Sequence, residues 1–417
     1  MGDYELICLD DGSVVEERYT LSCGTPGHSG LLRTRYASKT LDVKPHGGVF
    51  KFHDWLPVRS VIPTESAPVA FRSEGLSKEL GLRNLTVAFT GYYPERGAKV
   101  KSCTFKEMEA LPTYARLADC GGGTIVVASA GNTARAFAQI ASETGNRCVI
   151  VVPRSAEDRI SVTEDNGNAK LLAVDGDYFD AIRTADRIVA LGGYVSEGGA
   201  RNVARRDGMG TVMLEGALSM GRVPDRYFQA VGSGTGGISA WEASMRLIGD
   251  GRYGDRLPKL HLAQNAPFTP MAKAWNAGRR TISDEDLGDP ARDIPQVYAD
   301  VLTNRKPPYS MAGGVFDAMT ACGGSFLEVT NDEARSAEKL WMSIENARPD
   351  PAASVALASL MKSVEDGSVS ADEHILLNMT GGGLDRAREE LSMVTVRPSA
   401  RISPDIAEDE LRGVLDA

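Results

Sequence analysis

Between residues 124 and 191 the chain alternates short apolar runs with longer stretches in which apolar residues recur every three or four positions. Short apolar runs are typical of parallel strands buried on both faces, and the longer pattern is typical of amphipathic helices. The sequence therefore predicts strands at residues 125–128, 148–152 and 170–174. It predicts helices at residues 133–144, from about residue 156, and at 178–191.

A second region of strands and helices is predicted between residues 227 and 383. Its expected strands are residues 227–231, 259–263 and 374–378. One helix is expected from the end of a glycine loop through Met245, and two further helices at residues 331–346 and 351–362. The segment from about 265 to 325 is expected to be irregular, and the first sixty residues to form short strands and turns, with a strand at 30–36. Strands alternating with helices imply parallel sheets covered on both faces. The predicted fold class is α/β, with a boundary between the regions near residues 198–210.

Composition narrows the choice of partners. The 417 residues carry 46 lysines and arginines against 56 aspartates and glutamates, a formal net charge of −10. No basic cluster stands out, so we expect neither nucleic acid nor a membrane as a partner. No apolar run is long enough to span a bilayer, and the acidic start Met-Gly-Asp-Tyr-Glu lacks the apolar core of a signal peptide. These features predict a cytoplasmic protein.

The six cysteines are scattered, and none forms a Cys-x-x-Cys pair that would indicate a redox dithiol or a zinc site. Cys8, Cys23 and His28 are of the types that bind metals, but the local sequence offers no fourth ligand, and no bound metal is expected. Cys103 has no histidine nearby in the sequence to activate it, which favours a buried and inert thiol.

The segment Ser102-Cys103-Thr104-Phe105-Lys106-Glu107 places one lysine at the start of a helical pattern. A lysine amine can bind the aldehyde of pyridoxal 5′-phosphate (PLP) covalently. A lysine at a helix start is more often a solvated surface residue, so the assignment of Lys106 depends on three further motifs and on their order.

The first of these motifs is the turn Ser129-Ala130-Gly131-Asn132-Thr133, which ends a predicted strand and opens a helix. The Asn132 amide can contact the ring hydroxyl of PLP. Backbone N–H groups at a helix start can hold a substrate carboxylate, and this role is assigned to Ser129, Ala130, Gly131 and Thr133. The alternative is an ordinary connection capped by Asn132 or Thr133.

The second motif is the loop Gly232-Ser233-Gly234-Thr235-Gly236-Gly237. Glycines let backbone N–H groups close on an anion, and the following helix adds its positive dipole end. The residues expected to hold the cofactor phosphate are Gly232, Gly234, Thr235, Gly236 and Gly237. The loop also matches G-x-G-x-x-G, so a dinucleotide site and a purely structural turn stay open as alternatives.

The third motif is Asn378-Met379-Thr380-Gly381-Gly382-Gly383, at the carboxyl end of the last predicted strand. Ligands of open α/β sheets collect at this edge. A Thr380 hydroxyl there can hydrogen-bond the pyridine nitrogen of PLP without holding that nitrogen protonated, which favours the loss of a β-leaving group. The alternative is a glycine-rich turn with Thr380 as a local cap.

In this order the motifs resemble those of the tryptophan synthase β-like family of PLP enzymes, called fold type II, from about Tyr4 to Gly383. Residues 52–58 and 348–354 resemble segments of threonine synthase within that family. The lysine segment departs from the usual Pro-Thr-Gly-Ser-Phe-Lys-Asp of that enzyme, and residues 63–68 replace its Gly-Asn-Thr-Pro-like segment. These departures indicate a paralogue of threonine synthase with a different reaction.

The resemblance implies two parallel-sheet α/β domains with the active site between them. Residues 1–110 and 205–417 would form a larger PLP-binding domain, and residues 111–204 a smaller one. The implied reaction is a β-replacement in which O-phospho-L-serine and sulfite give L-cysteate and phosphate, a step toward coenzyme M. Lys106 would be the catalytic lysine, with Asn132 on the ring hydroxyl and Thr380 on the ring nitrogen.

The implied cofactor is PLP, and the implied partners are the two small substrates and further copies of the chain in a homo-oligomer. Two anionic substrates need a local positive patch in a negatively charged protein, for which Lys99 and Lys101 are candidates. Three alternatives stay open: threonine synthase acting on O-phosphohomoserine, a nicotinamide-dependent dehydrogenase based on the glycine loop, and a PLP-fold ligand sensor without turnover.

Overall fold

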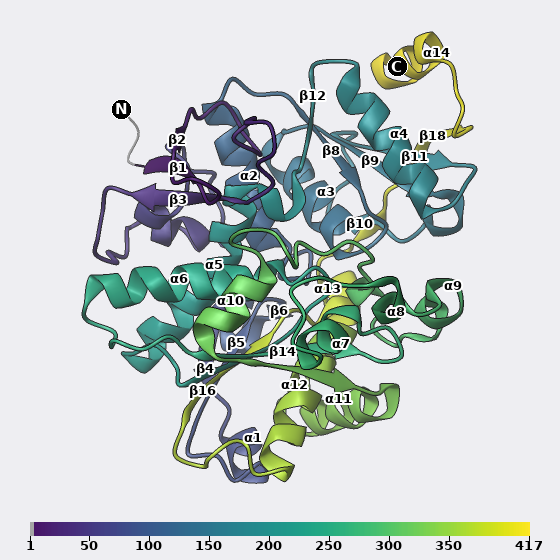
Figure 1. The fold of residues 1–417 in the computed structure, drawn as a ribbon. Helices are drawn as coiled ribbons and strands as arrows, with labels where there is room; N and C mark the ends of the chain where they lie inside the picture. The colour runs from purple at the N-terminus through teal and green to yellow at the C-terminus, as the bar shows by residue number, and fades with distance from the viewer. Residues whose placement is uncertain (1–3) are drawn as a thin grey trace.

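The computed structural model describes residues 4–417, in which two largely parallel sheets occupy different halves of the molecule (Figure 1). The larger sheet has the strand order β15-β14-β13-β16-β5-β4. Its strands are β4 (Val69–Arg72), β5 (Asn84–Phe89), β13 (Arg226–Ala230), β14 (Lys259–Asn265), β15 (Ser325–Val329) and β16 (His374–Met379). All neighbours are parallel except β4, which is antiparallel to β5.

Helices cover both faces of the larger sheet. On one face, Ile375 and Leu377 of β16 belong to a buried cluster that contains α11 (Asn331–Glu345) and α12 (Pro351–Glu365). Leu376 points to the opposite face, where α5 (Val203–Met220) and α6 (Thr235–Asp250) pack. Successive residues of a strand face opposite sides of the sheet, so a strand that is apolar almost throughout is buried on both faces.

The smaller sheet has the order β12-β8-β9-β11-β18 and is parallel throughout. Its strands are β8 (Thr124–Ala128), β9 (Cys148–Pro153), β11 (Ala169–Val174), β12 (Tyr194–Ser196) and β18 (Pro398–Ile402). Val126 faces a cluster with α4 (Tyr178–Ala190) and α14 (Glu408–Asp416), whereas Val127 faces the cluster that contains α3 (Asn132–Thr144). This sheet too is therefore covered on both sides.

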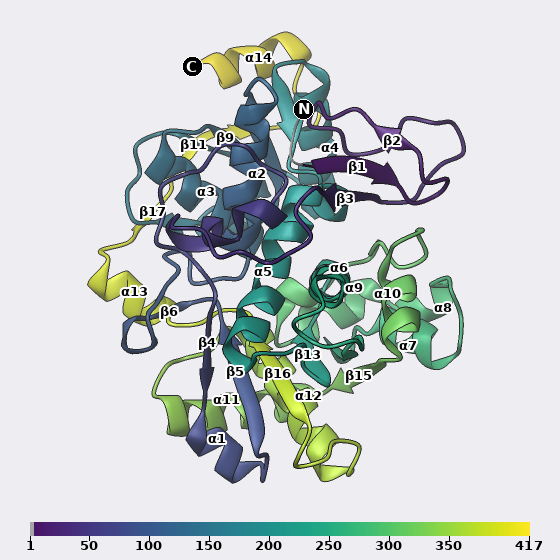
Figure 2. The same ribbon diagram turned by 90° about the vertical axis from the view of Figure 1, so that its left-hand side faces the viewer.

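A third, antiparallel sheet with the order β2-β1-β3 lies at the N-terminal end and consists of β1 (Tyr4–Cys8), β2 (Val14–Val15) and β3 (Leu32–Tyr36). The Thr34 and Tyr36 hydroxyls donate to the Asp207 carboxylate of α5 at 2.7 and 2.6 Å. Helix α5 also packs against α2 (Glu107–Asp119) and against β4 and β5, so it lies between the two larger sheets (Figure 2).

The remaining elements are short. The small ladders pair β6 (Tyr92–Tyr93) with β7 (Ala98–Lys99) and β10 (Ser161–Val162) with β17 (Val394–Thr395). The short helices are α1 (Glu74–Glu79), α7 (Pro270–Asn276), α8 (Asp284–Leu287), α9 (Pro290–Asp293), α10 (Val315–Cys322) and α13 (Leu384–Glu390), together with 3₁₀ turns that include Gly48–Trp55 and η6 (Asp300–Leu302). The segment from 265 to 325 thus holds several short helices where we expected irregular chain.

The predicted α/β fold class is confirmed, and the predicted strands and helices of both regions appear with small shifts of their ends. The helix expected from about residue 156 is wrong, because β10 pairs there with β17, more than 230 residues away. Such long-range pairing overrides weak local preference. The predicted domain division placed residues 205–417 together, whereas β18 and α14 pack on the smaller sheet. The rest of that division stays a prediction.

Candidate active site

The predicted motifs meet at the carboxyl edge of the larger sheet. Thr380 follows β16 and Gly232 lies just beyond β13, and these strands are parallel neighbours. The backbone N–H of Phe105 donates to the Thr380 carbonyl oxygen at 2.9 Å, and the N–H of Gly382 donates to the Cys103 carbonyl at 3.1 Å. These two bonds place the lysine segment directly beside the glycine turn after β16.

The turn after β8 reaches the same place from the smaller sheet. The Asn132 amide nitrogen donates to the Asp350 carboxylate at 3.1 Å, and the Asp350 N–H donates to the Gly381 carbonyl at 2.9 Å. Arg135, one turn further along α3, donates to the Asn132 amide oxygen and to the Ser102 carbonyl, both at 2.8 Å. The structure therefore joins three of the four sequence motifs through hydrogen bonds.

The glycine loop after β13 is connected to the Ser129–Thr133 turn through η6. A Cβ atom added to Gly131 would lie 3.3 Å from a Val301 methyl group, and one added to Gly232 would lie 3.1 Å from the Val301 carbonyl oxygen. The same residue thus touches both turns, which brings the two expected anion-binding loops to either side of one short segment.

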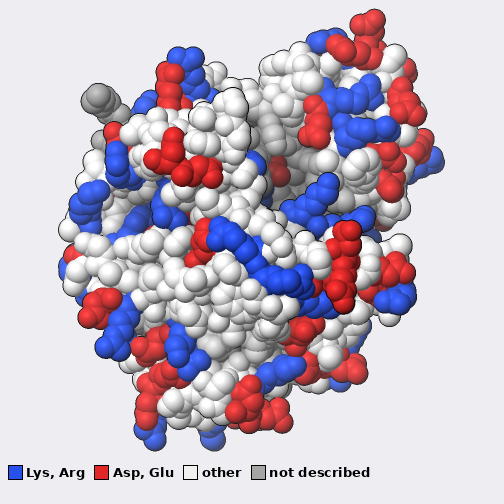
Figure 3. Space-filling view, viewed as in Figure 1, with Lys and Arg blue, Asp and Glu red and all other residues white. Residues whose placement is uncertain are grey.

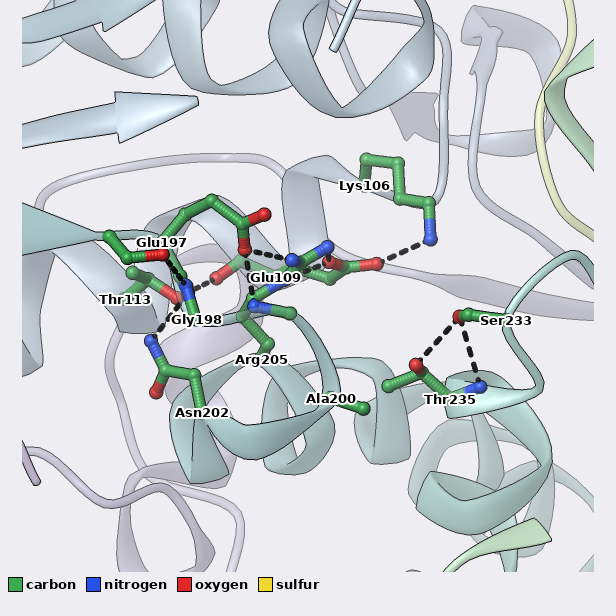
Figure 4. Close-up of polar contacts among 12 residues, drawn as sticks. Lys106, Glu109, Thr113, Glu197, Gly198, Ala200, Asn202, Arg205, Ser233 and Thr235 are labelled. Carbon is green, nitrogen blue, oxygen red and sulfur yellow. Dashed lines mark hydrogen bonds and ion pairs between the residues drawn. The ribbon is translucent and has the colours of Figure 1, made fainter. Parts of the chain in front are cut away.

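Lys106 lies at the start of α2, and its side chain is only 26% exposed. Its ammonium donates to the Glu109 carboxylate at 2.7 Å, one helical turn further on. Figure 4 shows the lysine side chain extending from α2 toward Glu109, with Ser233 and Thr235 on the neighbouring loop. The structure therefore contradicts the alternative in which Lys106 is a solvated surface residue.

Glu109 is fully buried and also pairs with Arg205 of α5, which in turn pairs with Glu197 (Figure 4). Burial opposes ionisation of the Glu109 carboxyl, but the positive charges of Arg205 and Lys106 outweigh it and hold the pKa of Glu109 below its usual value. The sequence reasoning missed these three residues. The i, i+3 spacing of Lys106 and Glu109 is a signal for one of them, whereas nothing local points to Arg205 or Glu197.

The neighbouring Glu107 is in a different environment. Its carboxylate accepts hydrogen bonds from the Ser102 N–H at 2.8 Å and from the Ser66 hydroxyl, and it takes part in none of the ion pairs found among residues 4–417. Burial therefore dominates and raises the pKa of Glu107 above its usual value. The first turn of α2 thus carries two buried carboxyl groups with opposite shifts, and the one with the lowered pKa contacts Lys106.

Cys103 lies three residues before Lys106 with left-handed backbone (φ +57°) and is 1% exposed. Burial raises the pKa of its thiol to about 12, which leaves the thiol protonated at neutral pH. The structure therefore agrees with the interpretation of Cys103 as an inert residue that shapes the turn before the lysine.

The glycine loop is tightly packed. A Cβ atom on Gly236 would lie 2.0 Å from the Gln229 amide nitrogen, and one on Gly234, whose φ is +80°, would lie 2.4 Å from a Val315 methyl group. These glycines let the start of α6 sit against the sheet, where its first N–H groups have no intrahelical partner. The Ser233 and Thr235 hydroxyls lie 2.7 Å apart at this helix start. A terminal phosphate fits this cradle of donors.

Thr380 also fits a bound cofactor. It is 8% exposed, and among residues 4–417 its hydrogen bond is made by the backbone carbonyl and not by the hydroxyl. A half-buried lysine amine, a helix start with two hydroxyls and an unpartnered threonine hydroxyl at one sheet edge match what PLP requires of a protein. The Asn132 amide is less available to a cofactor than the Thr380 hydroxyl, because its nitrogen contacts Asp350 and its oxygen contacts Arg135.

Lys99 and Lys101, the candidates for a positive patch, are each neutralised by a carboxylate. Lys99 pairs with Glu65 at 2.9 Å and Lys101 with Glu143 at 3.1 Å. Figure 3 shows further lysine and arginine side chains near the middle of the viewed face, between the two halves of the molecule. Within the described chain no helix is both long and apolar enough to cross a membrane.

Comparisons with known proteins agree with this geometry. The family model described as pyridoxal-phosphate dependent enzyme matches residues 71–381. The chain is 55% identical to a cysteate synthase of Methanocorpusculum labreanum over 94% of this chain and 95% of that protein. It is 48% identical to a cysteate synthase of Methanosarcina barkeri over 99% of this chain and all of that protein.

Solved structures share the fold at low identity. A pyridoxal 5′-phosphate-dependent aspartate racemase and a serine racemase from maize each reach a TM-score of 0.58 with 17% identity over 78% of this chain, and cover 92% and 91% of their own chains. The family match sets aside the nicotinamide-dependent alternative for the glycine loop. The chain belongs to the family of pyridoxal-phosphate dependent enzymes, in the group that holds these cysteate synthases.

Proposed function

We propose that this PLP-dependent enzyme converts O-phospho-L-serine and sulfite into L-cysteate and phosphate. The observation that carries the proposal is the identity of 55% and 48% to cysteate synthases across nearly the whole length of both chains. The arrangement around Lys106 supports it, because Lys106 is the one residue in the four motifs whose side chain can bind the cofactor covalently. The expected homo-oligomer and cytoplasmic location stay predictions.

When bound, PLP withdraws electrons from the α-carbon of an amino-acid substrate and so eases the loss of its α-proton and of a β-phosphate. Lys106 would hold the cofactor through Nζ between turnovers and, once the substrate amine had replaced it, would accept the α-proton at the same atom. Phosphate would leave from the β-carbon with the electrons of the carbon–oxygen bond, sulfite would form the new carbon–sulfur bond there, and Nζ would return the proton to the α-carbon.

Glu109 acts on this proton transfer through Lys106 and is a positioning residue. Its carboxylate contacts Nζ at 2.7 Å and is kept ionised mainly by Arg205. This contact fixes the direction in which the flexible lysine side chain points, and proton transfer to Nζ requires such a fixed geometry.

The substrate and cofactor anions are assigned to two helix starts. The N–H groups of Ser129–Thr133 precede α3 and hold the substrate carboxylate, and the loop from Gly232 to Gly237 before α6 holds the cofactor phosphate. Asn132 would contact the ring hydroxyl, oriented by Asp350 and Arg135. Arg135, which donates to the neutral oxygens of Ser102 and Asn132, supplies buried positive charge in a protein whose net charge is −10.

Thr380 offers its hydroxyl to the ring nitrogen. A neutral hydroxyl does not hold that nitrogen protonated, as a carboxylate would. This choice of partner favours rapid departure of the β-phosphate over side reactions such as transamination.

The test is phosphate release by the PLP-loaded enzyme from O-phosphoserine and from O-phosphohomoserine, each with and without sulfite. We expect sulfite to accelerate release from phosphoserine and L-cysteate to form in equal amount, with kinetics in which phosphate departs before sulfite adds. The Lys106→Ala variant is the control for release without enzyme chemistry.

Faster, sulfite-independent release from phosphohomoserine would replace the proposal by threonine synthase activity. A yellow protein that binds PLP but turns over neither phosphoamino acid would instead be a ligand sensor.

A further inference from the structure

Cys8, Cys23 and His28 come together in the N-terminal sheet, far from the Lys106 motifs in sequence. Cys8 ends β1, and the other two lie in the loop between β2 and β3. The His28 Nδ1 atom is 3.6 Å from the Cys8 sulfur and 3.4 Å from the Cys23 sulfur, and all three ligand atoms lie within 4.8 Å of one another. No other group of this kind occurs among residues 4–417.

These spacings suit one tetrahedral metal ion. With Zn–S near 2.3 Å and Zn–N near 2.0–2.1 Å, the sulfur-to-nitrogen edge of a zinc tetrahedron is about 3.6 Å. The two measured edges lie within about 0.2 Å of that length. Two thiol ligands and an imidazole are a set that favours Zn²⁺ over the oxygen-preferring Mg²⁺, Ca²⁺ and Mn²⁺.

One carboxylate lies beside this group, outside the set of ligand atoms that all lie within 4.8 Å of one another. One Asp10 carboxylate oxygen lies 4.0 Å from the Cys8 sulfur and is held by the Gly30 backbone N–H at 2.7 Å. A Cβ atom on residue 30 would lie only 2.8 Å from that oxygen, so a glycine is needed for the approach. The sequence analysis did not recognise Asp10 as a ligand, because a Cys-x-Asp segment is not one of the spacings that indicate a zinc site.

We propose that Cys8, Cys23 and His28 bind one Zn²⁺ ion in a closed, structural site, and that the Asp10 carboxylate turns toward the ion to become the fourth ligand. Each cysteine thiol loses its proton as it binds the ion, and the ion undergoes no change of oxidation state. The site is separate from the reacting groups and does not depend on the substrates of the enzyme.

The segment between the two cysteines shows what the ion would stabilise. Glu17 accepts hydrogen bonds from Arg116 of α2 at 2.9 and 3.0 Å, and the Tyr19 hydroxyl accepts one from Asn202, the residue that caps α5, at 3.1 Å. These two helices carry Glu109 and Arg205. A metal ion that closes the loop from Cys8 to His28 would therefore hold this segment against the helices that position Lys106.

The experiment measures zinc in the purified, PLP-loaded enzyme and after chelator treatment followed by addition of Zn²⁺ or Co²⁺. We expect one zinc per chain, a thiolate-to-metal absorption band with Co²⁺, and a lower unfolding temperature after chelation that zinc restores. Cys23→Ser and His28→Ala should lose the ion. Cys322→Ala, which removes a buried cysteine of α10, is the matched control and should keep it.

Full zinc affinity in Asp10→Ala would overturn the assignment of the fourth ligand. If chelator-treated wild-type enzyme takes up no zinc, and Cys8 and Cys23 react with an alkylating reagent at the same rate with and without zinc, the site does not exist. Because zinc content and thiol protection are measured without substrate, this failure would leave the proposed reaction untouched.

Discussion

At the residue scale, the contact between Lys106 and Glu109 differs from the surface ion pairs around it. Lys99 and Glu65 are both more than half exposed, and such a pair contributes about 0–1 kcal/mol. Glu109 is fully buried and its charge is compensated by two cations, so the loss of both would leave a buried charge uncompensated at a cost of about 3–5 kcal/mol. This network of ion pairs holds the Lys106 side chain in one orientation.

Two substitutions separate binding of the cofactor from orientation of the lysine. After borohydride reduction of the PLP-loaded enzyme, peptide mapping should find the label on Lys106, and Lys106→Ala should carry none. Glu109→Gln should keep the label on Lys106 but lower kcat, because Nζ loses the carboxylate that orients it. A label on Lys99 or Lys101 in the wild-type enzyme would contradict the assignment.

At the scale of elements, the close packing of α2 on α5 determines where the lysine lies. Gly208 of α5 faces α2 so closely that an added Cβ atom would lie 2.0 Å from the Met108 carbonyl oxygen and 2.9 Å from the Pro112 ring. Met108 lies between Lys106 and Glu109 along the first turn of α2. A wider spacing of these helices would therefore move Glu109 away from Arg205 and disturb the site.

We expect Gly208→Ala to lower the free energy of unfolding by about 1–3 kcal/mol, since a backbone oxygen cannot move aside easily. It should also lower activity. Gly249→Ala is the matched control, because Gly249 lies in α6 with nothing within 4 Å of the added atom and should be stabilising by about 0.5–1 kcal/mol. Urea unfolding of both variants checks this, and equal effects would contradict the packing argument.

At the scale of the whole molecule, His261 makes stability depend on pH. Arg226 donates to its Nε2 atom at 3.0 Å, so the ring is neutral with its proton on Nδ1, facing the Ser325 hydroxyl at 2.9 Å. Burial, together with the Arg226 charge, lowers the pKa of His261 from 6.5 to about 4. Between these two values the unfolded chain binds a proton that the folded protein does not.

Stability from this residue is therefore complete above pH 6.5 and is lost as the pH falls to about 4, with a total of about 3 kcal/mol. His261→Gln should flatten the fall in unfolding free energy over this range, measured in urea at several pH values. His46→Gln, at a solvent-exposed histidine, should keep the wild-type slope. An unchanged slope in His261→Gln would show that another group carries the effect.

The elements with a local pattern could be predicted from the amino-acid sequence. The apolar runs of β8, β9 and β11 and the helical periods of α3 and α4 were sufficient, because a strand buried on both faces and an amphipathic helix each have a period of their own. The four motifs in chain order also indicated a PLP site. Three of the four follow a strand as a small-residue turn, and the carboxyl ends of parallel strands are where ligands collect.

The contacts between distant segments could not be predicted and are known from the folded chain alone. Glu109 and Arg205 are 96 residues apart, Cys8 and His28 are 20 apart, and β18 joins the smaller sheet from the far end of the chain. The helix expected near residue 156 failed for the same reason. Contacts of this kind depend on burial and charge supplied by other elements, and a local pattern carries no record of those partners.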